Sequence, residues 1–333
     1  MVATTIRYGD NFANLGSVTN SIPGKYLMSL ADEADAAPGM QLMNDTQSNA
    51  AGCQYKGIVN FPTTYGSLLI RILLRNNGTD LNVVHGYQSQ ITLSPVNRTT
   101  PALSKSTAPS LSVDLLNGSL TGSPAQQLLQ LTARLSPYNQ PELRSEVGNV
   151  SRILEFAGLR GGSYNQPPGV NLTEAEESAA LSILEDLSKP QSRELFNHGW
   201  LQFIPAISGN FFSDFAARAY IAVTGLGQLV PSEALYPQFV GESADANLYI
   251  GAQQATIFTF SAKPPVTGFW SLTAYGTNDY LIPNSLDVYA LGDRSNLTYA
   301  DGSLIYGESS INGRFQILMQ PADVTPPENW TNK

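Results

Sequence analysis

Cysteine and histidine are nearly absent from the sequence. Its 333 residues include a single cysteine, Cys53, and two histidines, His85 and His198. One cysteine excludes an intrachain disulfide and a cysteine-rich metal site. Two histidines cannot form a three-histidine metal site. We therefore predict that the protein holds no metal ion.

Sequence motifs of the common cofactor-dependent and hydrolytic enzymes are missing as well. The chain has no Gly-x-Ser-x-Gly, no Gly-x-Gly-x-x-Gly, no Gly-x-x-x-x-Gly-Lys-Ser/Thr and no His-Glu-x-x-His. These absences disfavour nucleotide-dependent redox chemistry, phosphoryl transfer and classical hydrolysis. We accordingly expect no cofactor.

Charged side chains are few, and most of them are acidic. Only 14% of the residues are charged, and 27 acidic against 18 basic side chains give a net charge of −9. Such a chain is not expected to bind nucleic acid or an anionic membrane. No apolar run approaches the roughly 18 residues that would predict a membrane-spanning helix. We predict neither nucleic acid nor membrane as a partner.

The sequence is rich in the acceptor triplet for N-glycosylation, Asn-x-Ser/Thr without an intervening proline. About four such triplets are expected by chance, and eight are present. They begin at Asn44, Asn77, Asn97, Asn117, Asn149, Asn171, Asn296 and Asn329. Coincidence in an Asn- and Ser-rich chain is the alternative explanation. We predict a secreted glycoprotein, although Met1–Thr5 does not resemble a signal peptide, so that the signal would have been removed or would precede the given chain.

The first third of the chain is predicted to be rich in strands. Residues 26–29 have the composition of a strand, and residues 56–60 and 65–75 that of two strands or of a strand followed by a helix. A short helix is expected over 80–88, and a closing strand over 91–93. A linker rich in Ser, Thr and Pro follows.

The middle of the chain is predicted to be helical and the last third to be all strands. Helices are expected to start at Ser123-Pro124 and at Gln140-Pro141. A capping box at Thr173-x-x-Glu176 predicts a third helix. Asp214 is expected to cap a fourth, which ends at Gly225. Beyond residue 244 we predict strands, including a β-meander over 267–291.

Two groups of motifs carry a family resemblance. One comprises Phe-Trp-Ser-Leu-Thr at 269–273, Tyr275, Asn284, Tyr289 and Gly-Asp-Arg at 292–294. The other comprises Arg218-Ala219, Gly225-Leu226-Gly227 and Pro-x-Glu-Ala-x-Tyr at 231–236. In order and spacing they resemble a family that pairs two domains of unknown function, numbered 1254 and 1214, and the chain is similar to a secreted, fungal-type member. The family has no accepted mechanism.

The resemblance implies an α+β, mainly β fold: two jelly-roll-like β-sandwich domains with a helical insert between them. The implied divisions are an N-terminal sandwich over 1–100, a linker over 101–122, the helical insert over 123–235 and a C-terminal sandwich over 236–333. Relatives carry an Asn-x-Asp-Thr-x-Tyr segment and several strands that have no counterpart upstream here. The first sandwich is therefore expected to be incomplete, and its open edge to be covered by a homodimer or by the helical insert. We favour the dimer.

Candidate site residues come from the polar and aromatic positions of these motifs and from one histidine. The catalytic candidates are Glu233, Arg218, His198 and Tyr275. The candidates for substrate binding are Trp200, Tyr236, Trp270, Asn284 and Arg294. Arg218 and Glu233 flank a glycine-rich bend and could form an ion pair. The alternative interpretation is architectural, with the ion pair pinning a helix and the aromatic rings filling the core.

Two functional hypotheses remain open from the sequence. In the first, the protein is a cofactor-independent isomerase, cyclase or lyase that acts on a small, fairly apolar organic molecule. In the second, it is a non-catalytic module that binds glycans or small molecules. An enclosed cavity with converging polar side chains would favour catalysis, and a shallow aromatic strip would favour binding.

Overall fold

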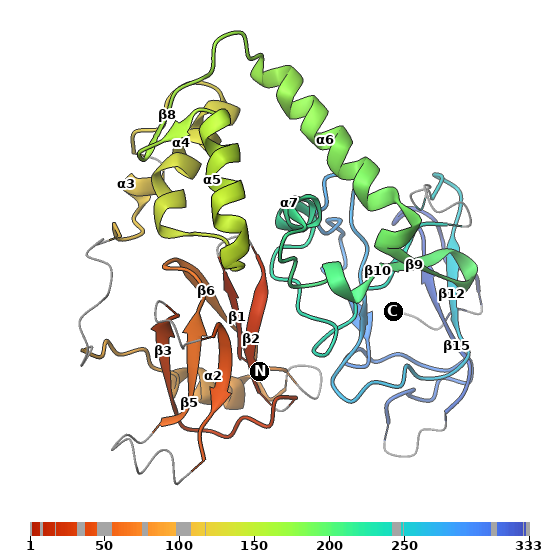
Figure 1. Ribbon diagram of the computed structural model, residues 1–333. Coiled ribbons are helices and arrows are strands. Elements are labelled where there is room, and N and C mark those ends of the chain that lie inside the picture. The colour runs from red at the N-terminus through yellow and green to blue at the C-terminus, as the bar shows by residue number, and fades with distance from the viewer. Residues whose placement is uncertain are drawn as a thin grey trace. The chain divides into compact units, whose positions relative to one another are not determined.

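The computed structural model describes most of the 333-residue chain (Figure 1). Described are residues 2–6, 9–16, 18–31, 37–44, 55–74, 79–97, 108–116, 118–241, 248, 250–307, 312–328 and 330; of residues 2–6 only the backbone is described. The chain divides into two compact units. Unit 1 contains residues 1–71 and 95–245, and unit 2 contains residues 72–94 and 246–333.

The strands of unit 1 form several small sheets. One sheet has the order β2 (Asn11–Leu15), β1 (Val2–Ile6), β6 (Gly66–Ile70), with antiparallel neighbours. A second has β5 (Tyr55–Phe61) between β3 (Lys25–Leu30), which runs parallel to it, and β4 (Gly39–Leu42), which runs antiparallel. The predicted strands at 26–29 and 56–60 are thereby confirmed.

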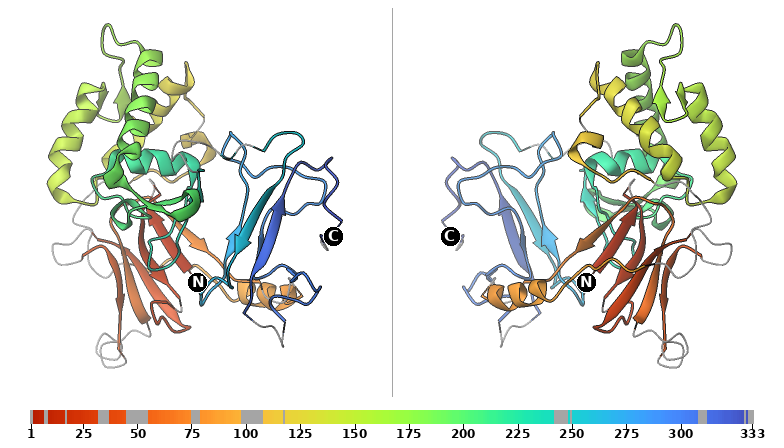
Figure 2. Two further views of the ribbon diagram at one scale, coloured as in Figure 1. Left: turned by 90° about the vertical axis from the view of Figure 1, so that its right-hand side faces the viewer. Right: turned by 90° about the vertical axis from the view of Figure 1, so that its left-hand side faces the viewer.

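The helices of unit 1 follow in the middle of the sequence. They are α3 (Val113–Leu116), α4 (Pro124–Leu135), α5 (Val147–Phe156), α6 (Leu172–Ser188) and α7 (Phe215–Thr224). Helix α6 contacts both α4 and α7. Within unit 1, Figures 1 and 2 show α4 and α5 at one end of the strands β1, β2 and β6. Short strand pieces complete the unit, namely β7 (Leu159–Arg160), β8 (Ser163–Tyr164), β9 (Arg193–Phe196), β10 (Trp200–Phe203) and β11 (Gln238–Phe239).

Capping residues in the sequence predicted most of these helix starts correctly, and two predicted starts need correction. The capping box of α4 is present, because Ser123 and Gln126 bond each other's backbone N–H. The cap of α6 is Asn171, whose side chain accepts from Thr173 N, and not Thr173. Helix α5 begins at Val147 rather than at Gln140-Pro141, because a 3₁₀ turn over Arg144–Glu146 precedes it.

Unit 2 consists of helix α2 (Leu81–Ser89) and short strands. Strand β12 (Thr256–Phe260) pairs antiparallel with β15 (Phe315–Met319), and β13 (Ser271–Leu272) pairs with β14 (Leu291–Gly292). Residues 91–93 form no strand, contrary to expectation. The predicted meander is reduced to β13, β14 and a single bridge between Tyr275 and Leu281.

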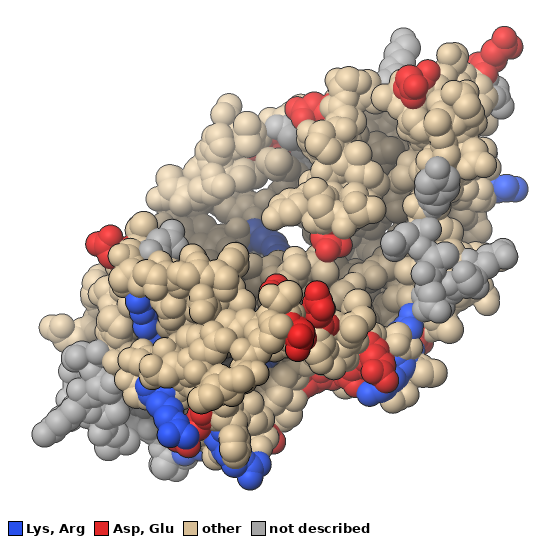
Figure 3. Space-filling view, turned by 90° about the horizontal axis from the view of Figure 1, so that it is seen from above, with Lys and Arg blue, Asp and Glu red and all other residues tan. Residues whose placement is uncertain are grey.

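An α+β fold with several small sheets is thus confirmed, whereas two jelly-roll sandwiches are not shown by the described residues. The division into four segments and the homodimer stay predictions. On the face drawn in Figure 3, uncharged residues make up most of the surface, as the 14% charged composition leads one to expect.

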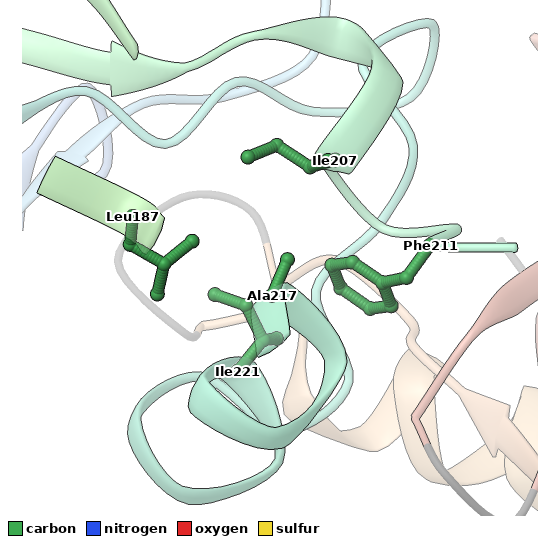
Figure 4. Close-up of a cluster of buried hydrophobic side chains, with 5 residues drawn as sticks. All are labelled: Leu187, Ile207, Phe211, Ala217 and Ile221. Atoms are coloured by element: carbon green, nitrogen blue, oxygen red, sulfur yellow. The ribbon is translucent and has the colours of Figure 1, made fainter. Parts of the chain in front are cut away.

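One core cluster of unit 1 lies between α6, α7 and the segment that joins β10 to α7. Its buried members are Leu187, Ile207, Phe211, Ala217 and Ile221 (Figure 4). Phe211 is 1% exposed and points at Ala217 of α7. This packing fixes the loop that leads into α7, and that loop positions the site described next.

Candidate functional site

A buried ion pair connects the start of β2 with α7. Asp10 is 0% exposed, and its Oδ2 lies 2.9 Å from Nε of Arg218. Its Oδ1 accepts a hydrogen bond from Phe211 N at 3.0 Å. Arg218 is positioned by the first turn of α7, where Asp214 caps the helix by accepting from Ala217 N at 2.9 Å. The pair therefore holds together segments that are about 200 residues apart.

Arg218 also holds the loop over residues 209–214. Its Nη2 donates to the carbonyl oxygen of Phe212 at 2.7 Å, and its guanidinium carbon lies 5.4 Å from the ring centroid of Phe215. Gly209 allows close approach at the start of this loop, because a Cβ there would lie 2.4 Å from the backbone of Leu229. The loop is thus fixed at both ends.

A second acidic side chain, Glu142, lies beside the ion pair. Burial raises the pKa of Glu142, and the charge of Asp10 raises it further, whereas Arg218 and a hydrogen bond from Asn210 lower it. Burial likewise raises the pKa of Asp10, against the attraction of Arg218. Glu142 Oε2 is buried without a hydrogen-bond partner among the described residues. Asp10 and Glu142, which share the guanidinium of Arg218, are therefore expected as a pair to release their protons at a higher pH than surface carboxyls do.

A cavity of about 430 Å³ lies against this cluster in unit 1. Its lining comes from β2, β4 and the segments before α7 and after it: Asn11, Phe12, Ala13, Asn14, Thr19, Met40, Pro205, Ser208, Asn210, Phe212, Val230 and Pro231. None of these lining residues is charged. The walls are apolar or aromatic, and the polar groups are amides and hydroxyls.

Two lining residues connect the cavity with the charged cluster. Asn210 lines the cavity, and its side chain lies close enough to Glu142 to lower the pKa of that carboxyl. Phe212 faces the cavity, and its carbonyl oxygen accepts from Arg218. A group bound beside Asn210 would therefore lie close to a carboxyl whose pKa is raised by burial.

A pair of buried asparagines forms one wall of the cavity. Asn11 Nδ2 donates to Asn14 Oδ1 at 2.8 Å, and Asn14 Nδ2 donates back to Asn11 Oδ1 at 3.0 Å. Asn11 Oδ1 also accepts from Val230 N at 3.1 Å. Burial of these amides is balanced by their mutual hydrogen bonds, so this wall is rigid.

The predicted residues in unit 1 fall into different environments. Arg218 belongs to the cluster just described, but it pairs with Asp10 and not with Glu233, so the expected ion pair is wrong. Glu233 is partly buried, its Oε2 has no hydrogen-bond partner among the described residues, and burial raises its pKa. Tyr236 accepts from Leu229 N at 3.2 Å through its hydroxyl. His198 is exposed in a left-handed backbone conformation, with φ of 63°.

The remaining predicted residues have neighbours of their own. Trp200 of unit 1 packs edge-on against Phe239 at 5.5 Å. In unit 2, Trp270 Nε1 donates to Tyr306 OH at 2.6 Å, and Arg294 Nε lies 2.9 Å from Asp293 Oδ2.

Two more predicted residues lie between β13 and β14. Asn284 holds its own turn by accepting from Leu286 N and Val288 N, both at 3.2 Å. Tyr275 is 58% exposed. For Asn284 an architectural role accounts for these hydrogen bonds, because all of them join its side chain to backbone groups within four residues.

Sequence reasoning missed Asp10, Asn11, Glu142 and Asn210. A signal was available for the first two, because polar residues interrupt the apolar pattern of the Asp10–Leu15 strand segment. Buried polar residues in a strand require partners, so such a pattern marks either a polar network or a site. Glu142 and Asn210 carry no comparable local signal.

Among the described residues, no three or more His, Cys, Asp or Glu side chains are grouped so that they could hold a metal ion. Nor does any helix of the described chain have the length and apolar character needed to cross a membrane.

Comparison with known proteins identifies two family models in the chain. The family model described as "Protein of unknown function (DUF1254)" matches residues 5–95. The model described as "Protein of unknown function (DUF1214)" matches residues 233–332. No curated protein matches the chain. Among solved structures, the VPA0106 protein from Vibrio parahaemolyticus is similar, with 18% identity, coverage of 96% of this chain and 70% of that one, and a TM-score of 0.44. The chain belongs to the family in which the domains DUF1254 and DUF1214 follow one another in tandem.

Proposed function

We propose that the protein is a secreted, cofactor-independent enzyme that isomerises, cyclises or eliminates from a small, uncharged and fairly apolar molecule. The observation that carries the proposal is an uncharged cavity placed against a buried acid cluster. An uncharged lining disfavours ionic ligands, because a buried charge needs a partner of opposite sign. The aromatic and apolar walls favour a hydrocarbon skeleton.

The proposed chemistry is proton donation to the bound molecule. Asn210 lines the cavity and contacts the ligand through its side-chain amide, which has two hydrogens to donate. Glu142, whose pKa is raised by burial and by the charge of Asp10, is the proposed proton source. It is not itself a lining residue, so the proton passes to the ligand through one water, and the resulting carboxylate takes a proton back from an adjacent carbon by the same route, which regenerates the acid. Arg218 stabilises the negative charge that is left on Glu142 after the proton has been transferred. A positioned general acid typically contributes 10²- to 10⁴-fold to a rate.

The test uses Glu142→Gln, which preserves the shape of the side chain and removes its proton. Protein is incubated with a panel of small, uncharged, unsaturated alcohols and ketones, and products are analysed by gas chromatography and mass spectrometry. Turnover of the active compound should fall by about 100-fold or more in the variant, whereas its dissociation constant should change little. Glu155→Gln, an exposed position on α5, is the matched control. Product formation by Glu142→Gln at the wild-type rate would contradict the assignment.

A binding module remains the second candidate, and one observation favours it. The stretch between β13 and β14 exposes several aromatic rings, with Tyr275 58%, Tyr280 74% and Tyr289 40% exposed. Exposed aromatic rings are suited to stacking on sugars. Binding of a panel compound or a glycan without any product, in wild type and Glu142→Gln alike, would favour this candidate over the enzyme.

Secretion is supported by the placement of the predicted glycosylation sites. The described acceptors Asn44, Asn97, Asn149, Asn171 and Asn296 are all exposed. Asn77, Asn117 and Asn329 lie outside the described residues. The proposal also retains the two jelly-roll-like sandwiches, and the antiparallel pairing of β1 with β2 and β6 and of β12 with β15 supports them.

A further inference from the structure

Phe212 has an unusual backbone conformation for an aromatic residue. Its φ of 46° lies in the left-handed region, which glycine and asparagine tolerate and bulky side chains avoid. Its ring lines the cavity and is 48% exposed, so core packing does not account for the conformation. A strained residue persists only where its surroundings over-determine it, and such residues concentrate at ligand sites.

The neighbours of Phe212 impose this conformation from both sides. On one side, the Phe211 side chain is buried in the core cluster with Ala217 and Ile221, and its N–H donates to Asp10. On the other side, Asp214 N donates to Phe211 O at 2.7 Å and its side chain caps α7.

The peptide between these anchors is fixed as well. Arg218 donates to the carbonyl oxygen of Phe212 at 2.7 Å. With both flanks held, the backbone at Phe212 is fixed, and the residue lies 48% exposed in the lining of the cavity. The buried acid cluster therefore has a second effect, which is to present this ring to a ligand.

The geometry points to Phe212 as a specificity-determining residue of the cavity, whose ring selects small, uncharged, planar ligands and excludes larger ones. The inference rests on the proposed function, since it concerns the same cavity. Phe12 provides a second aromatic wall, itself packed edge-on against Phe61 at 5.1 Å. A planar, unsaturated ligand would contact these rings and place its polar group at Asn210.

Two uncharged fluorescent probes of different size test the inference on the full chain. 1-Aminoanthracene is a planar three-ring molecule, and Nile red is larger. Fluorescence titration of wild type and Phe212→Ala gives a dissociation constant for each probe. We expect Phe212→Ala to bind 1-aminoanthracene about fivefold more weakly, because an aromatic contact is lost, and to bind Nile red more tightly than wild type does.

A pair of variants separates the ring from the backbone. Phe212→Ala and Phe212→Gly both remove the ring, but only glycine adopts a φ of 46° without strain. Phe212→Gly should therefore melt about 2 °C or more above Phe212→Ala. Equal melting temperatures would show that the backbone is not strained and would overturn that part of the inference. Phe156→Ala, at a 77% exposed position on α5, is the control for loss of a surface ring.

The remaining outcomes are distinguishable. If wild type binds both probes and Phe212→Ala weakens both equally or neither, the specificity role is overturned while the binding cavity stands. If wild type binds neither probe, the cavity does not accept uncharged planar ligands, and the inference fails together with the ligand class of the proposed function. Activity on an aliphatic panel compound in that case would preserve the enzyme and overturn only the role of Phe212.

Discussion

The two units of the chain bury different kinds of side chain. The described part of the chain has seven buried polar residues, and all belong to unit 1: Asp10, Asn11, Asn14, Thr63, Asn139, Ser208 and Gln228. The buried residues of unit 2 are apolar or aromatic, such as Phe258, Ile305 and Phe315. In unit 1, the side chains of Asp10 and Asn11 accept hydrogen bonds from backbone N–H groups about 200 positions away in the sequence. In unit 2, the side chain of Asn284 bonds backbone groups within four residues.

Unit 1 is therefore stabilised by buried hydrogen bonds as well as by apolar packing, whereas unit 2 is stabilised mainly by apolar packing. Burying a polar group is unfavourable unless it is fully bonded, so apolar residues are the simpler means of filling a core. Buried polar groups, where they occur, specify one arrangement or serve a site. In unit 1 three of these polar residues, Asn11, Asn14 and Ser208, line the cavity, which is why we propose that the function resides there.

The largest expected effect comes from breaking the buried pair in unit 1. Asp10→Asn removes the carboxylate that pairs directly with Arg218, at a position where Asp10 is 0% exposed, and leaves Glu142 as the only acidic side chain described beside the guanidinium. We expect unfolding of unit 1 to become easier by about 3–5 kcal/mol, as for other buried pairs that lose one partner. Urea denaturation followed by circular dichroism measures the change.

Unit 2 provides the matched comparison. Arg294 and Asp293 form an ion pair of the same 2.9 Å length, but their side chains are 31% and 15% exposed. Asp293→Asn should cost less than Asp10→Asn by a wide margin, about 1 kcal/mol or less for the partly solvated pair. If the two variants lose equal stability, burial is not what distinguishes the pairs, and the contrast between the units fails.

Much of the fold was predictable because the signals were local. The strands β3 and β5 and the helices α4, α6 and α7 follow from short-range composition and capping residues. The errors also have local causes. Asn171 and Thr173 are both good caps two residues apart, and the β-meander lost its strands because backbone groups near Asn284 bond that side chain instead of a neighbouring strand.

The site was predictable only in part, because long-range pairing has no local signal. Arg218 was found from its motif, but its partner was assigned to Glu233, only 15 positions away in the sequence. The actual partner, Asp10, is more than 200 positions away. Glu142 comes from a third segment, and only the folded chain brings these three together.

Acidification is expected to change the folding stability by a smaller amount, and the sign of the change should differ between the units. Burial raises the pKa of Glu142 and Glu233 above the usual 4.5. A raised pKa in the folded state means that protonation favours folding. The contribution is therefore fully present below pH 4.5 and is lost as the pH rises through the folded values.

Unit 2 contains the opposite case. Hydrogen bonds from Ser303 lower the pKa of Asp301 below 3.8, so its contribution is present above pH 3.8 and is lost as the pH falls through the folded value. As the pH falls from 8 to 4.5, thermal unfolding should show unit 1 becoming more stable, with no gain from Asp301 in unit 2. Glu142→Gln combined with Glu233→Gln should flatten this pH dependence. An unchanged slope in the double variant would refute the assignment.

The smallest effect concerns a surface asparagine of unit 1 that has two separable roles. Asn171 caps α6 through Oδ1, which accepts from Thr173 N at 3.1 Å, and a glycan would be attached to the other side-chain atom, Nδ2. Asn171→Asp keeps the cap and removes the glycan, whereas Asn171→Ala removes both. We expect the first to lose the mass of one glycan in protein from a eukaryotic host with almost no change in melting temperature. The second should lose the same mass and about 1 kcal/mol of stability. Equal masses for wild type and Asn171→Asp, before and after endoglycosidase, would mean that this acceptor is unoccupied and would weaken the case for secretion.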